Sequence, residues 1–335
     1  MKRPAPAETK ILICVRHRFT LWRTPPELAA QVRERWPEMN VVHLPSYDRM
    51  NEELPDTDIF VGYSLHPEQF LQARKLRWIH STAAGVAQLM YPELRASNVL
   101  VTKASGVHSI PMGEHILGTL VALARHFPAA VRYQLERRWA QQEIWDSPRR
   151  PRELVGQVLL IVGFGAAGRA LAQRAKPLGM RIWAVTRSGI ADPALAERVF
   201  PATQLDRALP EADFVVLAAP ETPETHHLIG DEQLAAMKRT AFLVNMARGS
   251  LVDEAALIET LERRAIAGAA LDVTKEEPLP PDSRLWSLEN VFLTPHIGAV
   301  SESLWDRQAQ LLLENLDRWF SGRELLNRVD LKRGY

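Results

Sequence analysis

The sequence contains very little cysteine, since Cys14 is the only one among 335 residues. A single cysteine excludes a framework of intrachain disulfides, and no cysteine or histidine spacing is typical of a zinc site. Cys14 lies in the apolar run Ile11–Val15, so we expect a buried thiol rather than a nucleophile. The side chains of the adjacent His226 and His227 should point apart, so we predict no metal site.

Long apolar runs and an excess of one charge are also absent. No apolar segment reaches the roughly 18 residues that span a bilayer, and the N-terminus lacks a signal-peptide core. We therefore expect a soluble, cytoplasmic protein without a membrane partner. The formal net charge of +1 gives no electrostatic footprint for nucleic acid. The one basic stretch, Pro148–Glu153, is interpreted as a solvated loop.

The chain is long enough for two domains, because one hydrophobic core rarely supports 335 residues. Up to about Lys103, short β-rich runs alternate with helical ones, which predicts parallel βαβ units. A helix is expected over Ser109–Phe127, then an irregular connection over Trp139–Glu153. The alternation restarts with six expected strands, VLLIV, RIWAV, DFVVLAA, AFLVN, AGAALDV and VFLTP, the number for two mononucleotide-binding halves. A last helix, about 303–320, is expected to return to the first domain.

A glycine-rich turn follows the first strand of the second series. VLLIV ends in GFGAAG, and a helical segment follows at once. The first glycine allows a tight turn, the second allows close approach of a pyrophosphate, and the third allows close packing of the helix on the strand. The free N–H groups and the dipole of the helix N-terminus favour a negative group there. The motif predicts a dinucleotide bound by Gly163, Gly165, Ala166, Ala167 and Gly168.

The end of the next strand indicates which dinucleotide binds. An NAD site usually has Asp or Glu there, about 20 residues after the glycines, to bind the ribose 2′-hydroxyl. This chain has Thr186, Arg187 and Ser188 instead. A guanidinium and two hydroxyls can bind a 2′-phosphate without like-charge repulsion, so the sequence favours NADP(H). NAD(H) stays an alternative if Arg187 only stacks over the adenine.

Three polar residues, Arg248, Glu277 and His296, each lie shortly after an expected strand of the second series. The carboxyl ends of parallel strands share one edge of a sheet, so these side chains should meet in one crevice. Reduction of a 2-keto acid needs a held carboxylate and a proton donor. Arg248 matches a carboxylate, His296 can donate a proton near neutral pH, and Glu277 would orient the imidazole.

Each of the three has a structural alternative. Arg248 could pair with Asp253, and Glu277 could be an exposed loop charge. His296 could be a buried imidazole with satisfied hydrogen bonds.

Three segments, LVNMARGSLVDEAALIETL, ALDVTKEEPLP and NVFLTPHIG, closely resemble the D-isomer-specific 2-hydroxyacid dehydrogenase family. The resemblance covers roughly residues 78–295, and its motifs are multiple, ordered and specific. It implies that Arg248 binds substrate, that Glu277 pairs with His296, and that His296 is the acid/base. It also implies an α/β fold of two doubly wound domains and usually a homodimer. A Rossmann dinucleotide-binding domain, 105–299, would be inserted into a discontinuous, flavodoxin-like substrate domain, 1–104 plus 300–335.

The resemblance places further residues near the ligands. The implied cofactor contacts are Ala219 and Pro220 beneath the adenosine, and Ala247, Asp272 and Gly298 at the nicotinamide end. In the first domain, IHSTAAGVAQL resembles the loop whose backbone N–H groups hold the substrate carboxylate, which points to Ala84 and Gly85. The family often has Asp where this chain has Ala87, a departure that puts only the detailed loop model in doubt.

We therefore expect an NAD(P)H-dependent reductase of small 2-keto acids such as glyoxylate or hydroxypyruvate. Ala83, Ala84 and Gly85 provide no bulky or charged side chain to match a long substrate. Two alternatives stay open, a 3-phosphoglycerate or other D-2-hydroxyacid dehydrogenase and a non-catalytic dinucleotide-sensing interaction protein. The complete Arg, Glu and His set argues for chemistry, because a sensor needs only the glycine-rich site. Formate oxidation fits less well, since it needs no such proton donor.

Overall fold

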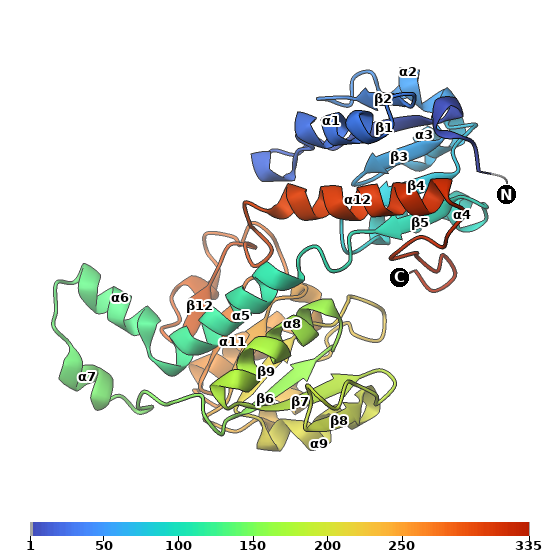
Figure 1. Ribbon diagram of the computed structural model, residues 1–335. Helices are drawn as coiled ribbons and strands as arrows, with labels where there is room; N and C mark the ends of the chain where they lie inside the picture. The colour runs from blue at the N-terminus through green and yellow to red at the C-terminus, as the bar shows by residue number, and fades with distance from the viewer. Residues whose placement is uncertain (1–2, 335) are drawn as a thin grey trace. The chain divides into compact units, whose positions relative to one another are not determined.

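The computed structural model describes residues 3–334, and the chain divides into two compact units. One unit comprises the chain up to His108 together with the chain from Val300 onward, and the other comprises Ser109–Ala299. Each unit has its own parallel sheet with helices on both faces (Figure 1). This architecture confirms the expected α/β fold class of two doubly wound domains.

The first unit has a sheet in the order β2-β1-β3-β4-β5, with every neighbouring pair parallel, which is the flavodoxin-like order. Successive side chains of a strand point to opposite faces. Ile11 and Ile13 therefore pack under α1 and α12, whereas Leu12 and Cys14 pack into a second core on the other face. The strands are β1 (Lys10–Cys14), β2 (Asn40–His43), β3 (Ile59–Gly62), β4 (Trp78–Ser81) and β5 (Leu100–Lys103). The helices are α1 (Pro26–Arg35), α2 (Met50–Glu53), α3 (Pro67–Gln72), α4 (Pro92–Arg95) and α12 (Leu304–Phe320).

The second unit has a parallel sheet in the order β12-β11-β10-β9-β6-β7-β8. From β8 to β11 this is the Rossmann order, and β12 extends it by one strand. The strands are β6 (Val158–Val162), β7 (Arg181–Thr186), β8 (Arg198–Pro201), β9 (Phe214–Leu217), β10 (Phe242–Asn245), β11 (Gly268–Leu271) and β12 (Val291–Leu293). The sequence pattern did not predict β8, because it is a short edge strand without fully buried residues that ends in proline.

The helices of the second unit are α5 (Ser109–Ala124), α6 (Phe127–Leu135), α7 (Gln141–Trp145), α8 (Ala166–Ala175), α9 (Leu205–Ala208), α10 (Asp231–Ala236) and α11 (Glu254–Glu262). The long helix expected over 109–127 ends early, because His126 adopts a left-handed φ of 60° and a new helix starts at Phe127, with Pro128 in its first turn. The connection expected to be irregular contains α7, and α6 and α7 form a lobe beside the sheet in Figure 1.

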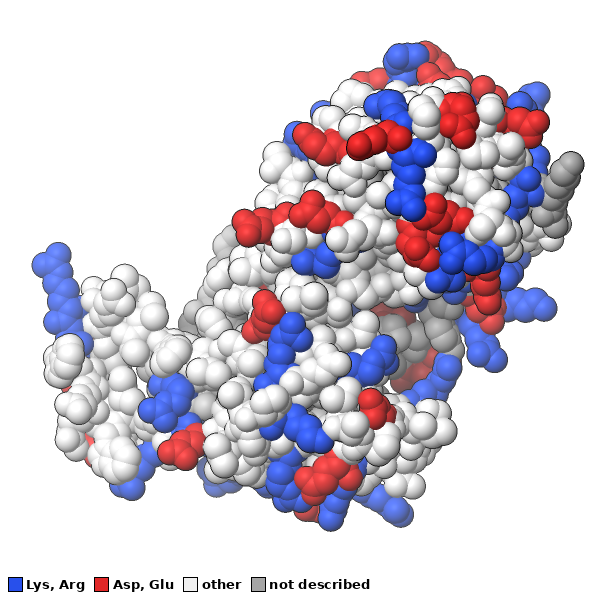
Figure 2. Space-filling model, viewed as in Figure 1, with Lys and Arg blue, Asp and Glu red and all other residues white. Residues whose placement is uncertain are grey.

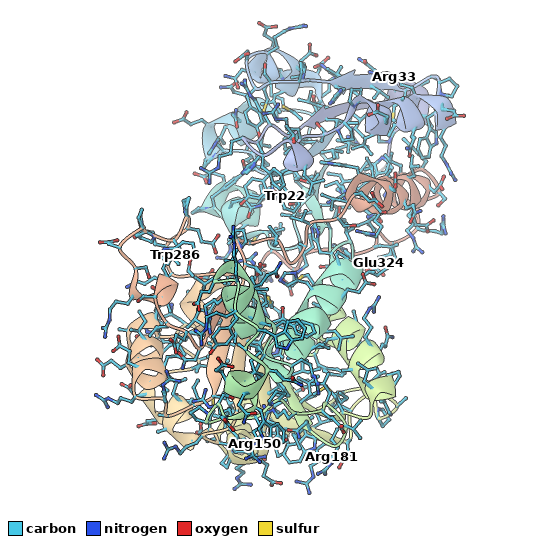
Figure 3. All side chains as sticks on the ribbon, turned by 90° about the vertical axis from the view of Figure 1, so that its left-hand side faces the viewer. Trp22, Arg33, Arg150, Arg181, Trp286 and Glu324 are labelled. Atoms are coloured by element: carbon cyan, nitrogen blue, oxygen red, sulfur yellow. The ribbon has the colours of Figure 1, made fainter. Side chains whose placement is uncertain are left out.

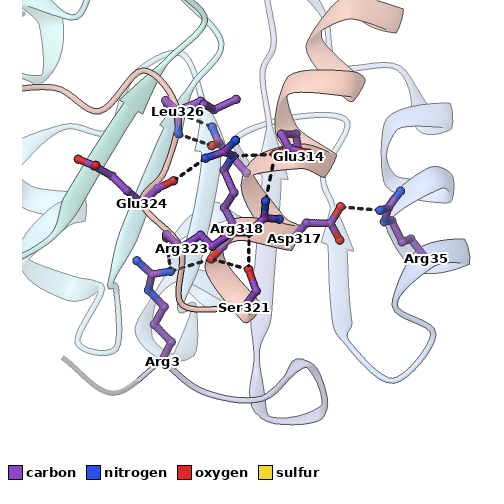
Figure 4. Close-up of polar contacts among 10 residues, drawn as sticks. Arg3, Arg35, Glu314, Asp317, Arg318, Ser321, Arg323, Glu324 and Leu326 are labelled. Atoms are coloured by element: carbon purple, nitrogen blue, oxygen red, sulfur yellow. Dashed lines mark hydrogen bonds and ion pairs between the residues drawn. The ribbon is translucent and has the colours of Figure 1, made fainter.

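The final helix α12 packs in the first unit, on the same core as α1. Figure 4 shows its polar ties: Asp317 binds Arg35 of α1 at 2.5 Å, and Glu314 binds Arg318 at 2.6 Å. Arg3 donates hydrogen bonds to three carbonyl groups at and after the end of α12. A cation near the C-terminus of a helix satisfies carbonyls that lack partners within the helix. These contacts hold the last helix against the start of the chain.

Two expectations about charged and polar residues need correction. The stretch Pro148–Glu153 is a loop that is only partly solvated: Pro148, Arg150 and Glu153 are exposed. Arg149 instead donates to the carbonyl of Ile266 at 2.8 Å, and Arg152 lies over the rings of Phe214 and Phe242. These arginines join the connection to the sheet. The rings of His226 and His227 do not diverge either, since they stack with centroids 4.1 Å apart.

Opposite charges are interspersed over the face shown in Figure 2. Among residues 3–334, no helix is both long and apolar enough to cross a membrane. Within the same residues, no group of three or more histidine, cysteine or acidic side chains could hold a metal ion.

Candidate active site

The glycine-rich turn joins β6 to α8. Gly163 has a φ of +96°, and a Cβ there would lie 2.5 Å from the backbone nitrogen of Ala219. A Cβ on Gly168 would collide with the carbonyl of Gly163. Gly165 instead borders open space and precedes the first residue of α8, Ala166. The backbone is therefore bare where a pyrophosphate would approach the N–H groups of the helix N-terminus. These residues fit a dinucleotide.

The loop after β9 lies against this turn. Ala219 is the residue that leaves no room for a side chain at Gly163. The hydroxyl of Thr225 donates to the carbonyl of Pro220 at 2.8 Å and accepts from the backbone of Thr222 at 2.8 Å. This loop is therefore folded by its own hydrogen bonds.

Thr186 is the last residue of β7, Arg187 and Ser188 follow it, and none of the three is buried. The Thr186 hydroxyl is used within the turn, because it accepts from the backbone nitrogen of Ile190 at 3.1 Å and donates to its carbonyl at 3.2 Å. The Thr222 hydroxyl, and with it the positive charge of Arg187, lowers the pKa of Glu224. The guanidinium is thus near the loop after β9, at the same edge of the sheet as the glycine turn.

Arg248 follows β10, where the local backbone is tightly held. The amide of Asn245 donates to the Arg248 carbonyl at 2.8 Å, and its oxygen accepts from Ala247 at 3.1 Å. Gly249 must be glycine, because a Cβ would collide with the carbonyl of Thr274. The Arg248 side chain is exposed. It does not pair with Asp253, which instead caps α11 by accepting from two backbone N–H groups.

Glu277 and His296 meet although 19 residues separate them. The imidazole Nδ1 and the Glu277 Oε2 are 2.6 Å apart. The two side chains are 49% and 37% exposed, so the histidine is not a buried core residue and the glutamate is not a solitary loop charge. Among residues 3–334, no hydrogen-bond partner is found for His296 Nε2. One nitrogen is therefore held by a carboxylate, and the other is open.

Sheet topology accounts for this grouping. Strands β10, β11 and β12 are parallel neighbours, and they precede Arg248, Glu277 and His296 respectively. Their carboxyl ends lie at one edge, which is where doubly wound sheets bind ligands. Direct contact joins Glu277 and His296, while the Arg248 guanidinium donates to the carbonyl of Ala247 at 2.6 Å.

Asp272 and Gly298 lie in the same loop region but contact each other. The Asp272 carboxylate accepts from the backbone nitrogen of Gly298 at 2.9 Å, and it is 5% exposed. Sequence reasoning placed both residues but did not find two partners of this carboxylate, Thr294 and His115. The only sequence signal for this contact was Thr294, a hydroxyl residue directly after β12, where it can reach the loop after β11.

Ala84 and Gly85 belong to the first unit. They are exposed and follow the carboxyl end of β4. The turn is fixed by neighbouring backbone bonds, since Ala83 donates to the Ser81 hydroxyl and accepts from Ala104 at 2.9 Å.

Comparison with known proteins points to one family. The model for the NAD binding domain of D-isomer specific 2-hydroxyacid dehydrogenases matches residues 117–298. A glyoxylate reductase from Korarchaeum cryptofilum is 38% identical over 278 residues, which are 81% of this chain and 82% of that protein. A D-3-phosphoglycerate dehydrogenase from Methanocaldococcus jannaschii is 32% identical over 309 residues, 91% of this chain but only 58% of that longer protein.

A solved structure shows the same likeness over nearly the whole chain. The D-isomer specific 2-hydroxyacid dehydrogenase from Xanthobacter autotrophicus Py2, crystallised with NADPH and MES, superposes with a TM-score of 0.82 at 27% identity. The match covers 98% of this chain and 100% of that one.

Proposed function

This chain belongs to the D-isomer-specific 2-hydroxyacid dehydrogenase family, and we propose that it reduces small 2-keto acids of the glyoxylate and hydroxypyruvate type with NADPH. Membership confirms the expected family, and with it an NAD(P)-dependent oxidoreductase that reduces 2-keto acids with a nicotinamide dinucleotide. The identity of the substrate, the choice of NADP(H) and the role of each residue are the proposal.

The observation that carries the proposal is the contact of His296 with Glu277. Because Nδ1 is held at 2.6 Å by a carboxylate, Nε2 is the nitrogen that can deliver a proton. The Glu277 carboxylate orients the ring and stabilises its positive charge. Arg248, exposed at the same edge of the sheet, presents the planar fork that matches the carboxylate of a 2-keto acid.

The bound nicotinamide would supply the hydride. Gly163, Gly165 and Gly168, with the N–H groups of Ala166 and Ala167, would hold its pyrophosphate at the start of α8. Ala219 and Pro220 would lie beneath the adenosine, and Ala247, Asp272 and Gly298 at the nicotinamide end. The proton from His296 would then neutralise the alkoxide oxygen that forms as the carbonyl carbon accepts the hydride.

The preference for NADP(H) rests on Arg187. No carboxylate stands at the end of β7, and the Arg187 guanidinium together with the Ser188 hydroxyl can bind a 2′-phosphate. The Thr186 hydroxyl already has two partners in its turn, so we assign it a structural part in shaping this site.

The first unit would provide the substrate domain, made of 1–104 and 300–335, and the cofactor domain, 105–299, would be inserted between these two segments of the sequence. The backbone N–H groups of Ala84 and Gly85 would hold the substrate carboxylate, and small side chains there suit a short substrate. The relative from Methanocaldococcus jannaschii keeps 3-phosphoglycerate as the second candidate substrate. The cytoplasmic location stays a prediction.

We also propose a homodimer formed through the lobe of α6 and α7. Phe127, Val131 and Leu135 are spaced four residues apart on one side of α6 and are 52%, 52% and 80% exposed, and Trp139 is 93% exposed. The lobe is mostly white in Figure 2. An exposed apolar stripe of this kind is typical of a protein interface, and the family is usually dimeric. Light scattering of the protein and of Leu135→Glu tests this, with a monomeric variant expected.

Steady-state kinetics on a panel of 2-keto acids, each with NADPH and NADH, tests the proposed function. We expect the highest kcat/KM for glyoxylate or hydroxypyruvate with NADPH. The absence of turnover with both substrates would refute the substrate assignment, and a clear preference for NADH would refute the cofactor assignment. His296→Asn should lower kcat by about 10²-fold to 10⁴-fold while NADPH still binds. A dinucleotide sensor without catalytic function would show no turnover in either protein, and His296→Asn would leave its binding of NADPH unchanged.

A further inference from the structure

His296 has a backbone conformation that its neighbours must maintain. Its φ is 54°, in the left-handed region, which is unfavourable for a residue with a side chain. Such conformations persist only where the surrounding structure holds them. The direction of the imidazole therefore depends on the contacts of the turn Thr294–Gly298.

Asp272 holds this turn with its carboxylate and its backbone. Oδ1 accepts from the Thr294 hydroxyl at 2.6 Å and from the nitrogen of Ile297 at 2.9 Å. Oδ2 accepts from Gly298 at 2.9 Å, and the Asp272 carbonyl accepts from the nitrogen of His296 at 2.9 Å. A Cβ on Gly298 would lie only 2.9 Å from Oδ2, so no side chain fits there. The buried carboxylate thus binds three groups of one turn.

His115, from helix α5, is the next member of this network. Its Nε2 lies 3.2 Å from the Thr294 Oγ1 and 3.7 Å from the Asp272 Oδ1. The Thr294 hydroxyl has one proton, which it donates to the carboxylate, so it can only accept from the imidazole. His115 therefore donates its Nε2–H to Thr294, and the hydrogen bonds run from His115 through Thr294 to Asp272 in one direction.

Helix α5 is a firm base for His115. Gly113 allows α5 to approach α8 so closely that a Cβ there would lie 3.0–3.2 Å from backbone and side-chain atoms of Ala170. Helix α8 is the one that follows the glycine-rich turn. The imidazole is 20% exposed, in contrast to the 49% of His296. His115 thus connects the turn of His296 to the helices next to the cofactor site.

We propose that His115 is a positioning residue for the reaction. By donating to Thr294 it fixes the rotamer of Asp272, and Asp272 fixes the left-handed turn that aims His296. The proposal rests on the proposed role of His296 as proton donor. Without the imidazole of His115, the bond from the nitrogen of His296 to the Asp272 carbonyl would remain, but the Thr294 hydroxyl would lose the donor that directs it towards the carboxylate. The Asp272 carboxylate would then be held less firmly, and so would its bonds to Ile297 and Gly298.

Kinetics of His115→Ala, His115→Gln and Thr294→Val, with glyoxylate and NADPH, test the proposal. A misplacement of about 1 Å can cost about 10²-fold in rate. We expect His115→Ala and Thr294→Val each to lower kcat about 10-fold to 100-fold, with KM and the Kd of NADPH changed less than about twofold. Glutamine at 115 can donate from its amide nitrogen and should restore most of kcat. The double variant should be no worse than either single variant, because both break one chain of hydrogen bonds.

Glu114→Gln is the matched control, since Glu114 is the neighbouring residue on α5 and pairs with Arg174 instead. Its kcat should equal that of the unmodified protein. NMR of ¹⁵N-labelled histidine gives a readout independent of activity: the proton shared by His296 Nδ1 and Glu277 should be seen in the control and be lost or broadened in His115→Ala.

Three results would overturn the proposal: an unchanged kcat in His115→Ala, additive losses in the double variant, or an unchanged His296 proton signal. If His115→Ala does not fold, Thr294→Val carries the same test. A different result, full activity of His296→Asn, would refute the proposed function, and the NMR signal would still report whether His115 positions the ring.

Discussion

Trp319 of α12 stacks on Trp78 of β4, with ring centroids 5.5 Å apart and an interplanar angle of 25°. Both residues are 1% exposed or less, and the guanidinium of Arg3 lies over the Trp319 ring, 4.9 Å from its centroid. Trp319, only 16 positions before Tyr335, is therefore part of the core of the first unit.

Replacing this tryptophan should destabilise the first unit. Trp319→Ala leaves a large cavity beside Trp78, and removal of a buried aromatic side chain costs about 3–5 kcal/mol. Urea denaturation followed by circular dichroism should show a lower midpoint. Trp286→Ala, which removes a tryptophan that is 57% exposed, should change stability by less than about 1 kcal/mol. Equal effects of the two substitutions would contradict this account of the core.

The stability of the first unit should depend on pH through His80. This side chain is fully buried in β4 between Trp78 and Thr102, and burial lowers its pKa from the ordinary value of 6.5 to about 4. A lowered pKa means that the folded state favours the neutral ring. The contribution of neutral His80 to the free energy of unfolding is therefore complete above about pH 6.5. It decreases by roughly 3 kcal/mol as the pH falls towards about 4.

His80→Asn isolates this effect. The amide can still bond the hydroxyl of Thr102, and it does not titrate between pH 4 and pH 7. Denaturation midpoints measured across this interval should fall less in the variant than in the unmodified protein. The same pH slope in both would show that other groups cause it.

Glu277→Gln tests the pairing of the imidazole. Glutamine keeps the shape but cannot stabilise the positive charge of the ring, so kcat/KM should fall by about 10²-fold or more. Glu276→Gln changes the adjacent side chain and should leave kcat/KM unchanged. Steady-state rates with one 2-keto acid are sufficient, and similar rates for both variants would argue against the relay of Glu277 and His296.

Arg187→Ala should change the choice of cofactor. Charge-assisted hydrogen bonds contribute about 1.5–3 kcal/mol, so kcat/KM for NADPH should decrease about 10-fold to 100-fold while that for NADH changes little. Arg181→Ala is the control, because Arg181 lies at the opposite end of the same strand, β7, and pairs with Glu197. Arg181 is labelled at the bottom of Figure 3. A parallel loss with both cofactors would show that Arg187 does not read the 2′-phosphate.

The sequence predicted most elements because their signals are local. The continuous apolar run of β1 and the glycines between β6 and α8 can be recognised within a few residues. The end of α5 before His126 was not predicted, because apolar residues continue at helical spacing on both sides of His126. The left-handed backbone of His126 separates α5 from α6. The edge strand β8 was not predicted, because it has no fully buried residue.

The polar contacts were harder to predict than the strands. In the sequence, Arg152 resembles a surface charge in a run of arginines. In the structure, its guanidinium packs over Phe214 of β9 and Phe242 of β10. A guanidinium favours an aromatic face when one is available, and its availability depends on strand order. Composition alone does not contain that order.

The sequence by itself determined two parallel α/β sheets, a glycine turn for a dinucleotide, and the placement of Arg248, Glu277 and His296 after strands, because residue spacing encodes secondary structure and strand ends. The pairing of Glu277 with His296 was predicted as well, and the tertiary structure gave its geometry. Only the tertiary structure decided that His115 joins Thr294 and Asp272 across 179 and 157 positions of the chain. Hydrogen bonds between distant segments depend on which strands become neighbours and on which donors compete for each carboxylate. Both are settled only when the sheet has assembled.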